Sequence, residues 1–416
     1  MLYQLSYTRA PPIEPAARDP SSRVALPYPG PVVPPRPPLR VAFVMPSLGI
    51  GGAERVAVEQ IRALAGEADA VDVFLTGDGA RDLEGEARAA HPALGRVARV
   101  STTASLAWRL ACGRYDLLVT TGTRKAFRAA RWLGRVAPSR RPAVVSTIHT
   151  MYANHVESLA PFAQDVDAVA IPYDFRERVV RALLAPPDRV VVTPPFWPSL
   201  LAASGSAPAA DAGALRASWG VGDDAVVLGY FGRVAENKGI VPLVRAAGRL
   251  VATGSDVHVV VAGRVGDGAY EREVAVTAGP LGRRIHRLAW SARSAALLAA
   301  FDLFVQWTRR DGPALGPFEA LSVGTPALAT AVAGISAYLR DGVDAALVAK
   351  DEDDGSPPTP GDLARFEARL GGLVGDRAER LRLGAAGRER VRHLVATSDF
   401  GARFLEAARA ALESRR

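Results

Sequence analysis

Short apolar runs rich in Val, Ile and Leu alternate with Ala-, Leu- and Arg-rich stretches from residue 40 onward. Strands that are apolar along their whole length and alternate with helices are typical of parallel sheets covered on both faces. The pattern therefore predicts an α/β protein with two doubly wound, Rossmann-like domains facing across a cleft, with ligands at the carboxyl ends of the strands. The expected strands are residues 41–44, 71–75, 117–120, 144–148, 169–171, 190–192, 226–231, 258–262, 284–288, 303–306 and 326–329.

Interruptions of this rhythm set the expected domain boundaries. Residues 1–39 contain 11 of the 31 prolines, a density that prevents helix formation, so we expect a poorly ordered leader. Residues 199–215 are rich in Ala, Ser, Gly and Pro, and are expected to link a first domain over residues 40–198 to a second over residues 216–390. Residues 391–416 are expected to form a helix that packs back towards the first domain.

The composition excludes several classes of site. The single cysteine, Cys112, excludes a disulfide framework and a cysteine-ligated zinc site, and the six histidines are scattered, so no metal is expected. The net charge of +8 comes from 51 basic residues spread along the chain, so no nucleic-acid partner is expected. Neither a secretory signal pattern nor an apolar run near the ~20 residues that span a bilayer is visible, so the expected location is cytoplasmic.

The first motif, GIGGAE, follows the first expected strand and opens a helix. Gly51 and Gly52 would let the backbone approach a ligand, and the amides at a helix start favour an anion. The motif differs from a dinucleotide fingerprint because Glu54 replaces the third small residue, and its carboxylate would face a pyrophosphate. A nicotinamide-dependent oxidoreductase is thus a weaker alternative, and a tight turn without a ligand is another.

The second motif, FGRVAENKG, follows the first strand of the second expected domain. Arg233 and Lys238 lie five residues apart at the carboxyl end of that strand, where two cations suit a diphosphate. Lys238 is one of only three lysines among the 51 basic residues, which indicates that a compact ammonium is needed there. The alternative is a pair of surface charges on a turn.

The third motif, DGPALGPFEALSVGTP, follows the expected strand 303–306. The amides of Gly312, Ala314 and Leu315 can bind phosphate or sugar oxygens at the start of a helix. Asp311 and Glu319 flank these amides, which suits a nucleotide sugar with its sugar at Asp311 and its ribose at Glu319. The alternative is that Asp311 caps a turn and Glu319 is solvated.

Together the three motifs resemble the family-4 retaining glycosyltransferases of the GT-B fold, also described as glycosyl transferases group 1, over about residues 40–400. The resemblance is carried by SLGIGGAERV, GRVAENKG, the Asp311-x7-Glu319 segment with EALSVGTPALAT, and AVAGISAYLRDGVDAALV. It implies an enzyme that moves a sugar from a nucleoside-diphosphate sugar to an acceptor, with retained configuration and without a metal or other cofactor. The donor would bind the second domain and the acceptor the first.

The resemblance also implies roles for individual residues. Arg233 and Lys238 would hold the diphosphate, Glu319 the ribose, and Asp311 with residues 312–315 the transferred sugar. Gly51 and Gly52 would close on the phosphate, and His149, in the sequence TIHT, would lie near the sugar. The chain departs from the family by having Asp311 in place of the usual Glu, and Pro313 in the amide-bearing loop.

The acceptor remains open among a glycan, a lipid and a small natural product, and a non-catalytic nucleotide-sugar-binding partner protein is the alternative from another class.

A further feature concerns a possible contact with a membrane. Arg124, Arg128, Arg131 and Arg135 have the spacing of one helical stripe in a segment without acidic residues. Such a stripe can contact the anionic inner face of a membrane, although a solvated helix face would look the same.

Overall fold

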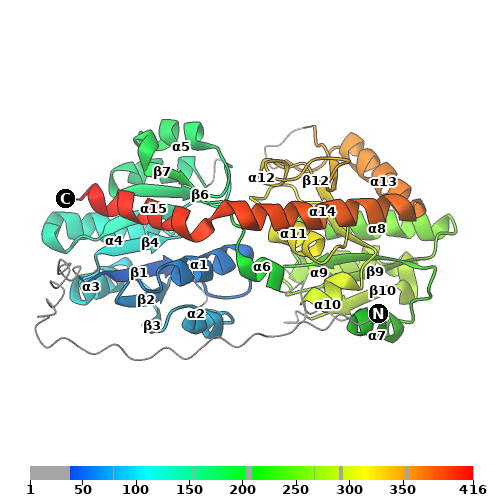
Figure 1. Ribbon diagram of the computed structural model, residues 1–416, viewed down its shortest axis with the longest axis horizontal. Coiled ribbons are helices and arrows are strands. Elements are labelled where there is room, and N and C mark those ends of the chain that lie inside the picture. Colours follow the sequence, from blue (N-terminus) through cyan, green and yellow to red (C-terminus); the bar gives the residue numbers. More distant parts are fainter. Residues whose placement is uncertain are drawn as a thin grey trace, which may run out of the picture. The chain divides into compact units, whose positions relative to one another are not determined.

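The computed structural model describes residues 38–77, 79–152, 155–202, 209–266, 268–289, 294–351 and 356–415 (Figure 1). The expected leader thus lies almost entirely outside the described residues, as do residues 203–208 of the expected linker. Residues Leu39–Arg416 form one compact unit that contains two separate parallel sheets. We call the first sheet with its helices the N-terminal lobe, and the second the C-terminal lobe.

Within the described residues, the sheet of the N-terminal lobe has seven parallel strands in the order β3-β2-β1-β4-β5-β6-β7. The strands are β1 (Arg40–Met45), β2 (Ala70–Leu75), β3 (Leu94–Arg99), β4 (Leu117–Thr120), β5 (Ala143–Thr147), β6 (Ala168–Ile171) and β7 (Val190–Val192). The helices are α1 (Gly52–Ala63), α2 (Glu84–Ala90), α3 (Thr103–Gly113), α4 (Arg124–Val136) and α5 (Arg176–Leu183), with 3₁₀ helices η1 (Pro138–Arg140), η2 (Glu157–Asp165) and η3 (Pro187–Arg189).

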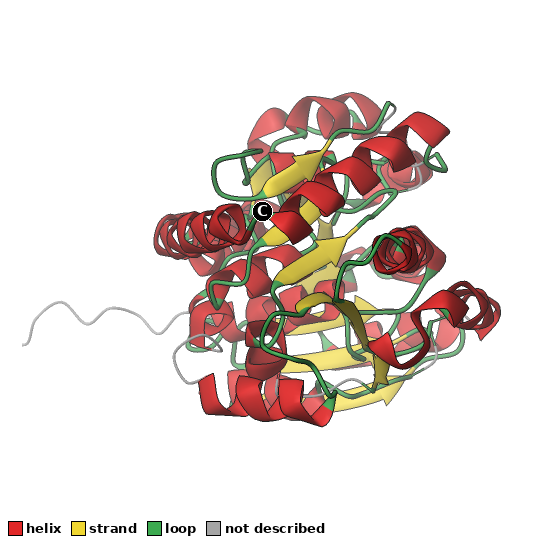
Figure 2. Cartoon of the chain, turned by 90° about the vertical axis from the view of Figure 1, so that its right-hand side faces the viewer, coloured by secondary structure: helices red, strands yellow, loops and turns green. Residues whose placement is uncertain are grey.

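The described part of the C-terminal lobe has a six-stranded parallel sheet in the order β10-β9-β8-β11-β12-β13, and Figure 2 shows strands as a central layer between helices. The strands are β8 (Val226–Phe231), β9 (Val257–Ala262), β10 (Ile285–Leu288), β11 (Leu303–Gln306), β12 (Ala327–Thr330) and β13 (Ala346–Val348). The helices are α7 (Ala209–Ser218), α8 (Ile240–Ala252), α9 (Gly268–Thr277), α10 (Ser294–Ala299), α11 (Leu315–Ser322), α12 (Ala333–Ser336) and α13 (Pro360–Gly375), with η4 (Glu236–Lys238) and η5 (Gly279–Arg284).

The strand order reverses beside the first strand of each sheet. β1 lies between β2 and β4, and β8 lies between β9 and β11, so consecutive crossovers run in opposite directions there. Such a switch point leaves a crevice at the carboxyl ends of the strands, where doubly wound proteins bind ligands. The predicted fold class, two Rossmann-like α/β domains, is confirmed by these two sheets.

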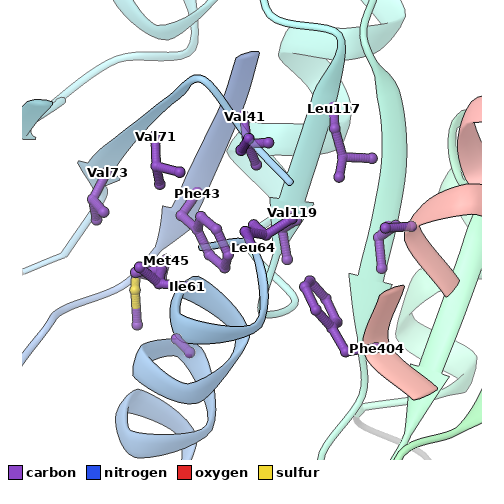
Figure 3. Close-up of a cluster of buried hydrophobic side chains, with 14 of the residues drawn as sticks. Val41, Phe43, Met45, Ile61, Leu64, Val71, Val73, Leu117, Val119 and Phe404 are labelled. Atoms are coloured by element: carbon purple, nitrogen blue, oxygen red, sulfur yellow. The ribbon is translucent and has the colours of Figure 1, made fainter. Parts of the chain in front are cut away.

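Apolar side chains fill both faces of the first sheet. One face packs against α3, α4 and α5, and the other packs against α1, α2 and the last helix, α15 (Phe400–Glu413). Figure 3 shows this second face, where Phe404 of α15 joins side chains from the central strands. Because Phe404 is completely buried, the last segment of the chain is part of the core of the first lobe.

Two strands that form edges of their sheets, β3 and β13, were not predicted from the sequence. β3 carries Arg96 and Arg99 and is partly exposed, and β13 has only three residues, so neither gives a clear apolar run. The predicted single helix over residues 391–416 is wrong in its bounds: α14 (Arg377–Ser398) and α15 are separated at Asp399, whose φ of 43° ends the first helix. The expected linker 199–215 includes most of α6 (Pro198–Ala202) and α7.

Candidate active site

The first part of the site is formed by the loops that follow β8 and β11, which are neighbouring strands. Gly239 has a φ of 68°, and a Cβ atom there would lie 1.8 Å from the carbonyl oxygen of Trp307. A glycine is therefore required for the close approach of the two loops. The backbone N–H of Arg309 donates to the carbonyl oxygen of Asn237 at 3.1 Å, which joins the loops at the carboxyl edge of the sheet.

This contact places Lys238 beside Asp311, although 73 residues separate them in the sequence. Lys238 Nζ donates to Asp311 Oδ2 in an ion pair, and the two side chains are 16% and 22% exposed. Gln306, the last residue of β11, donates from Nε2 to the same carboxylate oxygen at 3.5 Å. Two of the residues that the sequence analysis assigned to the donor are thus in direct contact.

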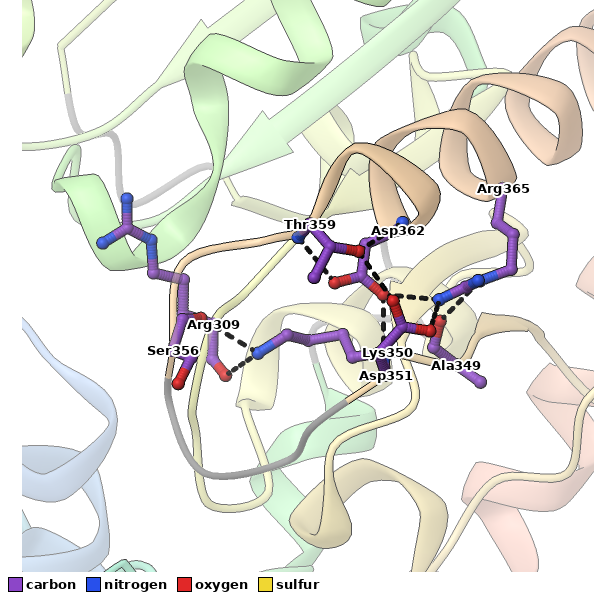
Figure 4. Close-up of polar contacts among 8 residues, drawn as sticks. All are labelled: Arg309, Ala349, Lys350, Asp351, Ser356, Thr359, Asp362 and Arg365. Atoms are coloured by element: carbon purple, nitrogen blue, oxygen red, sulfur yellow. Dashed lines mark hydrogen bonds and ion pairs between the residues drawn. The ribbon is translucent and has the colours of Figure 1, made fainter.

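A second lysine binds the backbone of this loop (Figure 4). Lys350 Nζ donates to the carbonyl oxygens of Arg309, at 3.1 Å, and Ser356, at 3.2 Å. Asp351 next to it pairs with Arg365 of α13 at 2.6 Å, so the segment after β13 is anchored to that helix. The backbone of the loop that carries Asp311 is therefore fixed by a network of hydrogen bonds that reaches α13.

The loop that begins at Gly312 lies directly against the N-terminal lobe. A Cβ atom on Gly312 would lie 1.9 Å from the carbonyl oxygen of His149, and one on Gly334 would lie 2.2 Å from the carbonyl carbon of Gly312. Only glycines fit at these two positions without moving backbone. Ala314 is the N-cap of α11 and Leu315 its first residue, so these two candidate donor-binding residues lie at the start of a helix, as expected.

His149 is held as a neutral imidazole. Burial lowers the pKa of His149 to about 4, and the nearby His155 acts in the same direction. Its Nε2 atom is buried and has no hydrogen-bond partner in the described part of the protein. The pKa of His155 is lowered by burial and by the charge of Arg310, while Asp311 opposes that shift, which shows that this carboxylate acts on the same region.

Arg233 lies at the end of β8, and its position is fixed mainly through its backbone. Tyr230 donates its hydroxyl to the carbonyl oxygen of Arg233 at 2.8 Å. A Cβ atom on Gly266 would lie 3.0 Å from Arg233 Cγ, so the side chain passes close to the loop after β9. Burial and the charge of Asp311 raise the pKa of Tyr230, and the charge of Arg233 lowers it. Within the described residues, Arg233 forms no ion pair.

The glycine-rich turn before α1 faces the start of α11. A Cβ atom on Gly52 would lie 3.8 Å from Leu315 Cδ1, so this part of the turn touches the loop that carries the candidate donor-binding amides. Glu54 is bound within the turn: its Oε1 accepts a hydrogen bond from Ser47 Oγ at 3.0 Å, and its Oε2 would be 2.3 Å from a Cβ on Gly51. Glu54 therefore folds back and braces the turn.

Glu319 has a partner that the sequence analysis did not identify. Arg55 Nη1 of α1 forms an ion pair with Glu319 Oε1 of α11, and the residues are 264 positions apart. Arg55 lies within the motif SLGIGGAERV, but a local pattern gives no information about a partner in the other half of the chain. No group of three or more His, Cys, Asp or Glu side chains in the described segments could hold a metal ion.

Two family models match the chain. The model described as Glycosyltransferase Family 4 matches residues 50–198, and the one described as Glycosyl transferases group 1 matches residues 225–356. The chain belongs to glycosyltransferase family 4. The first matched segment of this family-4 chain includes the glycine-rich turn and His149, and the second includes Lys238, Asp311 and Glu319.

Curated relatives of this family-4 chain align with part of it. Alpha-maltose-1-phosphate synthase of Mycobacterium tuberculosis is 31% identical over 185 residues, which are 43% of this chain and 46% of the relative. D-inositol 3-phosphate glycosyltransferase of Mycolicibacterium gilvum is 34% identical over 159 residues, which are 37% of this chain and 35% of the relative. The chain thus matches less than half the length of either relative.

Among solved structures, HepE of Anabaena in complex with UDP and glucose matches this family-4 chain with a TM-score of 0.69 and 17% identity, over 87% of this chain and 97% of HepE. At that identity the similarity concerns the fold. It shows that the two lobes are the two Rossmann-like domains of the GT-B fold, as the sequence analysis predicted.

Proposed function

We propose that this chain transfers a sugar, with retained anomeric configuration, from a nucleoside-diphosphate sugar to an acceptor bound by the N-terminal lobe. The observation that carries the proposal is the contact of Lys238 with Asp311 directly before the start of α11. A cation, a carboxylate and free backbone amides at one strand edge are the groups that a sugar diphosphate requires. HepE, which shares the fold, was solved with UDP and glucose.

The positive groups of the site would stabilise the departing diphosphate. When the bond between the anomeric carbon and the diphosphate oxygen breaks, negative charge grows on the diphosphate and positive charge on the sugar. The ammonium of Lys238 and the amides at the start of α11 would stabilise the first, with Arg233 as a second cation, and no metal is needed for this step. Since Lys238 is paired with Asp311 in the structure, the diphosphate would compete with that carboxylate for the ammonium.

The transfer itself would take place on one face of the sugar. An acceptor oxygen forms the new bond to the anomeric carbon on the side from which the diphosphate departs, and the acceptor proton passes to the departing phosphate oxygen. Asp311 would hold sugar hydroxyls, and the neutral His149 can exchange hydrogen bonds with them without adding charge. The close contact of Gly312 with His149 would help to keep water away from the reacting carbon.

The experiment is a thermal-shift panel of nucleotide sugars on the purified chain, followed by assays of donor hydrolysis and transfer with the donor that stabilises it. Lys238→Ala and Glu319→Ala should each abolish turnover while the chain still folds. Arg245→Ala, an exposed cation of α8 in the same lobe, is the matched control and should keep full activity. Full activity in either site variant would refute the proposal. Stabilisation by a donor without any turnover would instead favour the non-catalytic partner protein, and stabilisation by NAD alone would favour the oxidoreductase.

We further propose a peripheral contact of α4 with anionic membranes. Two tryptophans support it: Trp132 on α4 is 50% exposed and Trp108 on the adjacent α3 is 70% exposed, and tryptophan favours the membrane interface. Arg131 differs from the predicted stripe, since it is bound to Asp165 of η2. The exposed residues of α4 are Arg124, Arg128, Trp132, Arg135 and Val136.

This contact can be tested by pelleting with vesicles. The chain should sediment with vesicles that contain phosphatidylglycerol and stay in solution with phosphatidylcholine alone, and Trp132→Ala should weaken the binding. Leu381→Ala, which removes an apolar side chain of α14 that is 61% exposed, is the control. Equal sedimentation with both vesicle types would refute the contact. None of the helices in the described part of the chain is long and apolar enough to cross a membrane.

A further inference from the structure

The two lobes meet where the first turns of α1 face α11. Gly52 lies against Leu315, Arg55 pairs with Glu319, and Val56 is buried in an apolar cluster with Leu315 and Phe318 of the other lobe. Three residues of one face of α1 thus contact a single short helix. The turn that the sequence analysis assigned to the phosphate is therefore docked, through α1, on the helix that carries the candidate ribose ligand.

The ion pair of Arg55 and Glu319 is largely shielded from water. The two side chains are 26% and 13% exposed, and both line a cavity of about 200 Å³ between α1, α2, α6, α10 and α11. Glu59, another acid at this cavity, already accepts hydrogen bonds from Arg62 at 3.0 Å and from Ser199 at 3.2 Å. Arg55 is thus the cation that neutralises Glu319, and a charge-assisted bond in such a place is stronger than one in water.

The pair uses only one oxygen of the carboxylate. Arg55 binds Glu319 Oε1, while Oε2 receives no hydrogen bond from any residue that the structure describes. A carboxylate has two oxygens and about four lone-pair sites, so Glu319 can hold Arg55 and a diol at the same time. A side chain fixed at one oxygen also loses its freedom to rotate, which prepares the other oxygen for a ligand.

We propose that Arg55 is a positioning residue for the ribose of the donor, which acts by orienting the carboxylate of Glu319. Since the two side chains belong to different lobes, recognition of the ribose is coupled to contact between the lobes. The inference rests on the proposed function, in which Glu319 binds the ribose, and adds a residue of the N-terminal lobe to the donor site. A second interlobe ion pair, Arg264 with Asp82 at 3.1 Å, does not involve Glu319 and provides a comparison.

The test measures discrimination against a missing hydroxyl. The dissociation constants of UDP, ADP and GDP and of their 2′-deoxy forms are determined for the wild-type chain, for Arg55→Ala and for Arg264→Ala. A hydrogen bond to a charged group justifies a wild-type preference of about 10-fold or more for the ribose form of the nucleotide that binds. In Arg55→Ala this preference should fall to about 3-fold or less, while Arg264→Ala retains it. Inorganic pyrophosphate should bind Arg55→Ala as it binds the wild type.

A merely structural role gives a different result. If Arg55 only holds the two lobes together, Arg55→Ala would weaken the binding of the ribose and deoxyribose nucleotides equally. This outcome, or an unchanged preference for the ribose form, would overturn the proposal. Glu319→Gln should remove the preference too, and the double variant should show no further loss, which separates orientation of Glu319 from misfolding of one variant. A wild-type chain that binds both forms equally also overturns the role of Arg55. Binding of none of the three nucleotides would overturn the proposed function itself.

Discussion

Replacement of Gly312 by alanine tests the contact between the lobes with a single methyl group. The added Cβ would lie 1.9 Å from the carbonyl oxygen of His149, whereas an ordinary contact begins at 3.4 Å. The methyl group is attached directly to the backbone and the carbonyl oxygen is part of it, so neither can rotate away. The two must separate by about 1.5 Å. The loop that carries Asp311, or the whole lobe, has to move by that amount.

The expected loss follows from this displacement. A misplacement of about 1 Å at a reacting centre costs on the order of 100-fold in rate, which is about 2.7 kcal/mol of transition-state stabilisation. We therefore expect kcat/KM for the donor to fall at least about 100-fold in Gly312→Ala, while the unfolding temperature changes by only a few degrees because the cores of both lobes stay intact. Gly222→Ala is the matched control, since a Cβ there has no neighbour within 4 Å. Turnover within about 3-fold of the wild type would refute the reasoning.

Two further predictions concern His149 and Phe404. Since the folded pKa of His149 is about 4, below the unfolded value of about 6.5, the neutral form stabilises the fold fully above pH 6.5 and this stabilisation is lost as the pH falls towards 4. Denaturation of His149→Gln between pH 4 and 7 should show less acid sensitivity than the wild type, and equal sensitivity would contradict the assignment. Phe404→Ala should lower the free energy of unfolding by about 3–5 kcal/mol in urea titrations. The exposed control Arg409→Ala should change it by less than about 0.5 kcal/mol, and equal effects would show that α15 is not part of the core.

The sequence was sufficient for the parts of the fold that depend on local pattern. Continuous apolar runs such as 226–231 are buried on both faces, so their strands were predictable, whereas the edge strand β3 carries arginines and was missed. The bend at Asp399 was also missed, because an isolated left-handed residue leaves the helical pattern on both sides unchanged.

The candidate site was predictable as separate motifs and not as an arrangement. The loops around Lys238 and Asp311 were predicted from their glycines and acids, because each of these residue types indicates a possible ligand contact from its own segment alone. The ion pair of Arg55 with Glu319 and the contact of Gly312 with His149 depend on how two lobes meet, and no spacing within one segment contains that information. The roles of the individual residues in donor binding stay predictions until the variants are measured.

The position of α15 has a consequence for biosynthesis. Phe404, Ala407 and Ala411 fill the sheet of the first lobe, yet they lie near the end of the chain. A ribosome therefore releases the strands of that lobe long before the side chains that cover one of their faces are available. The first half of the protein should depend on chaperones or on transient collapse during translation, and a gene fragment that encodes it alone should yield aggregated material.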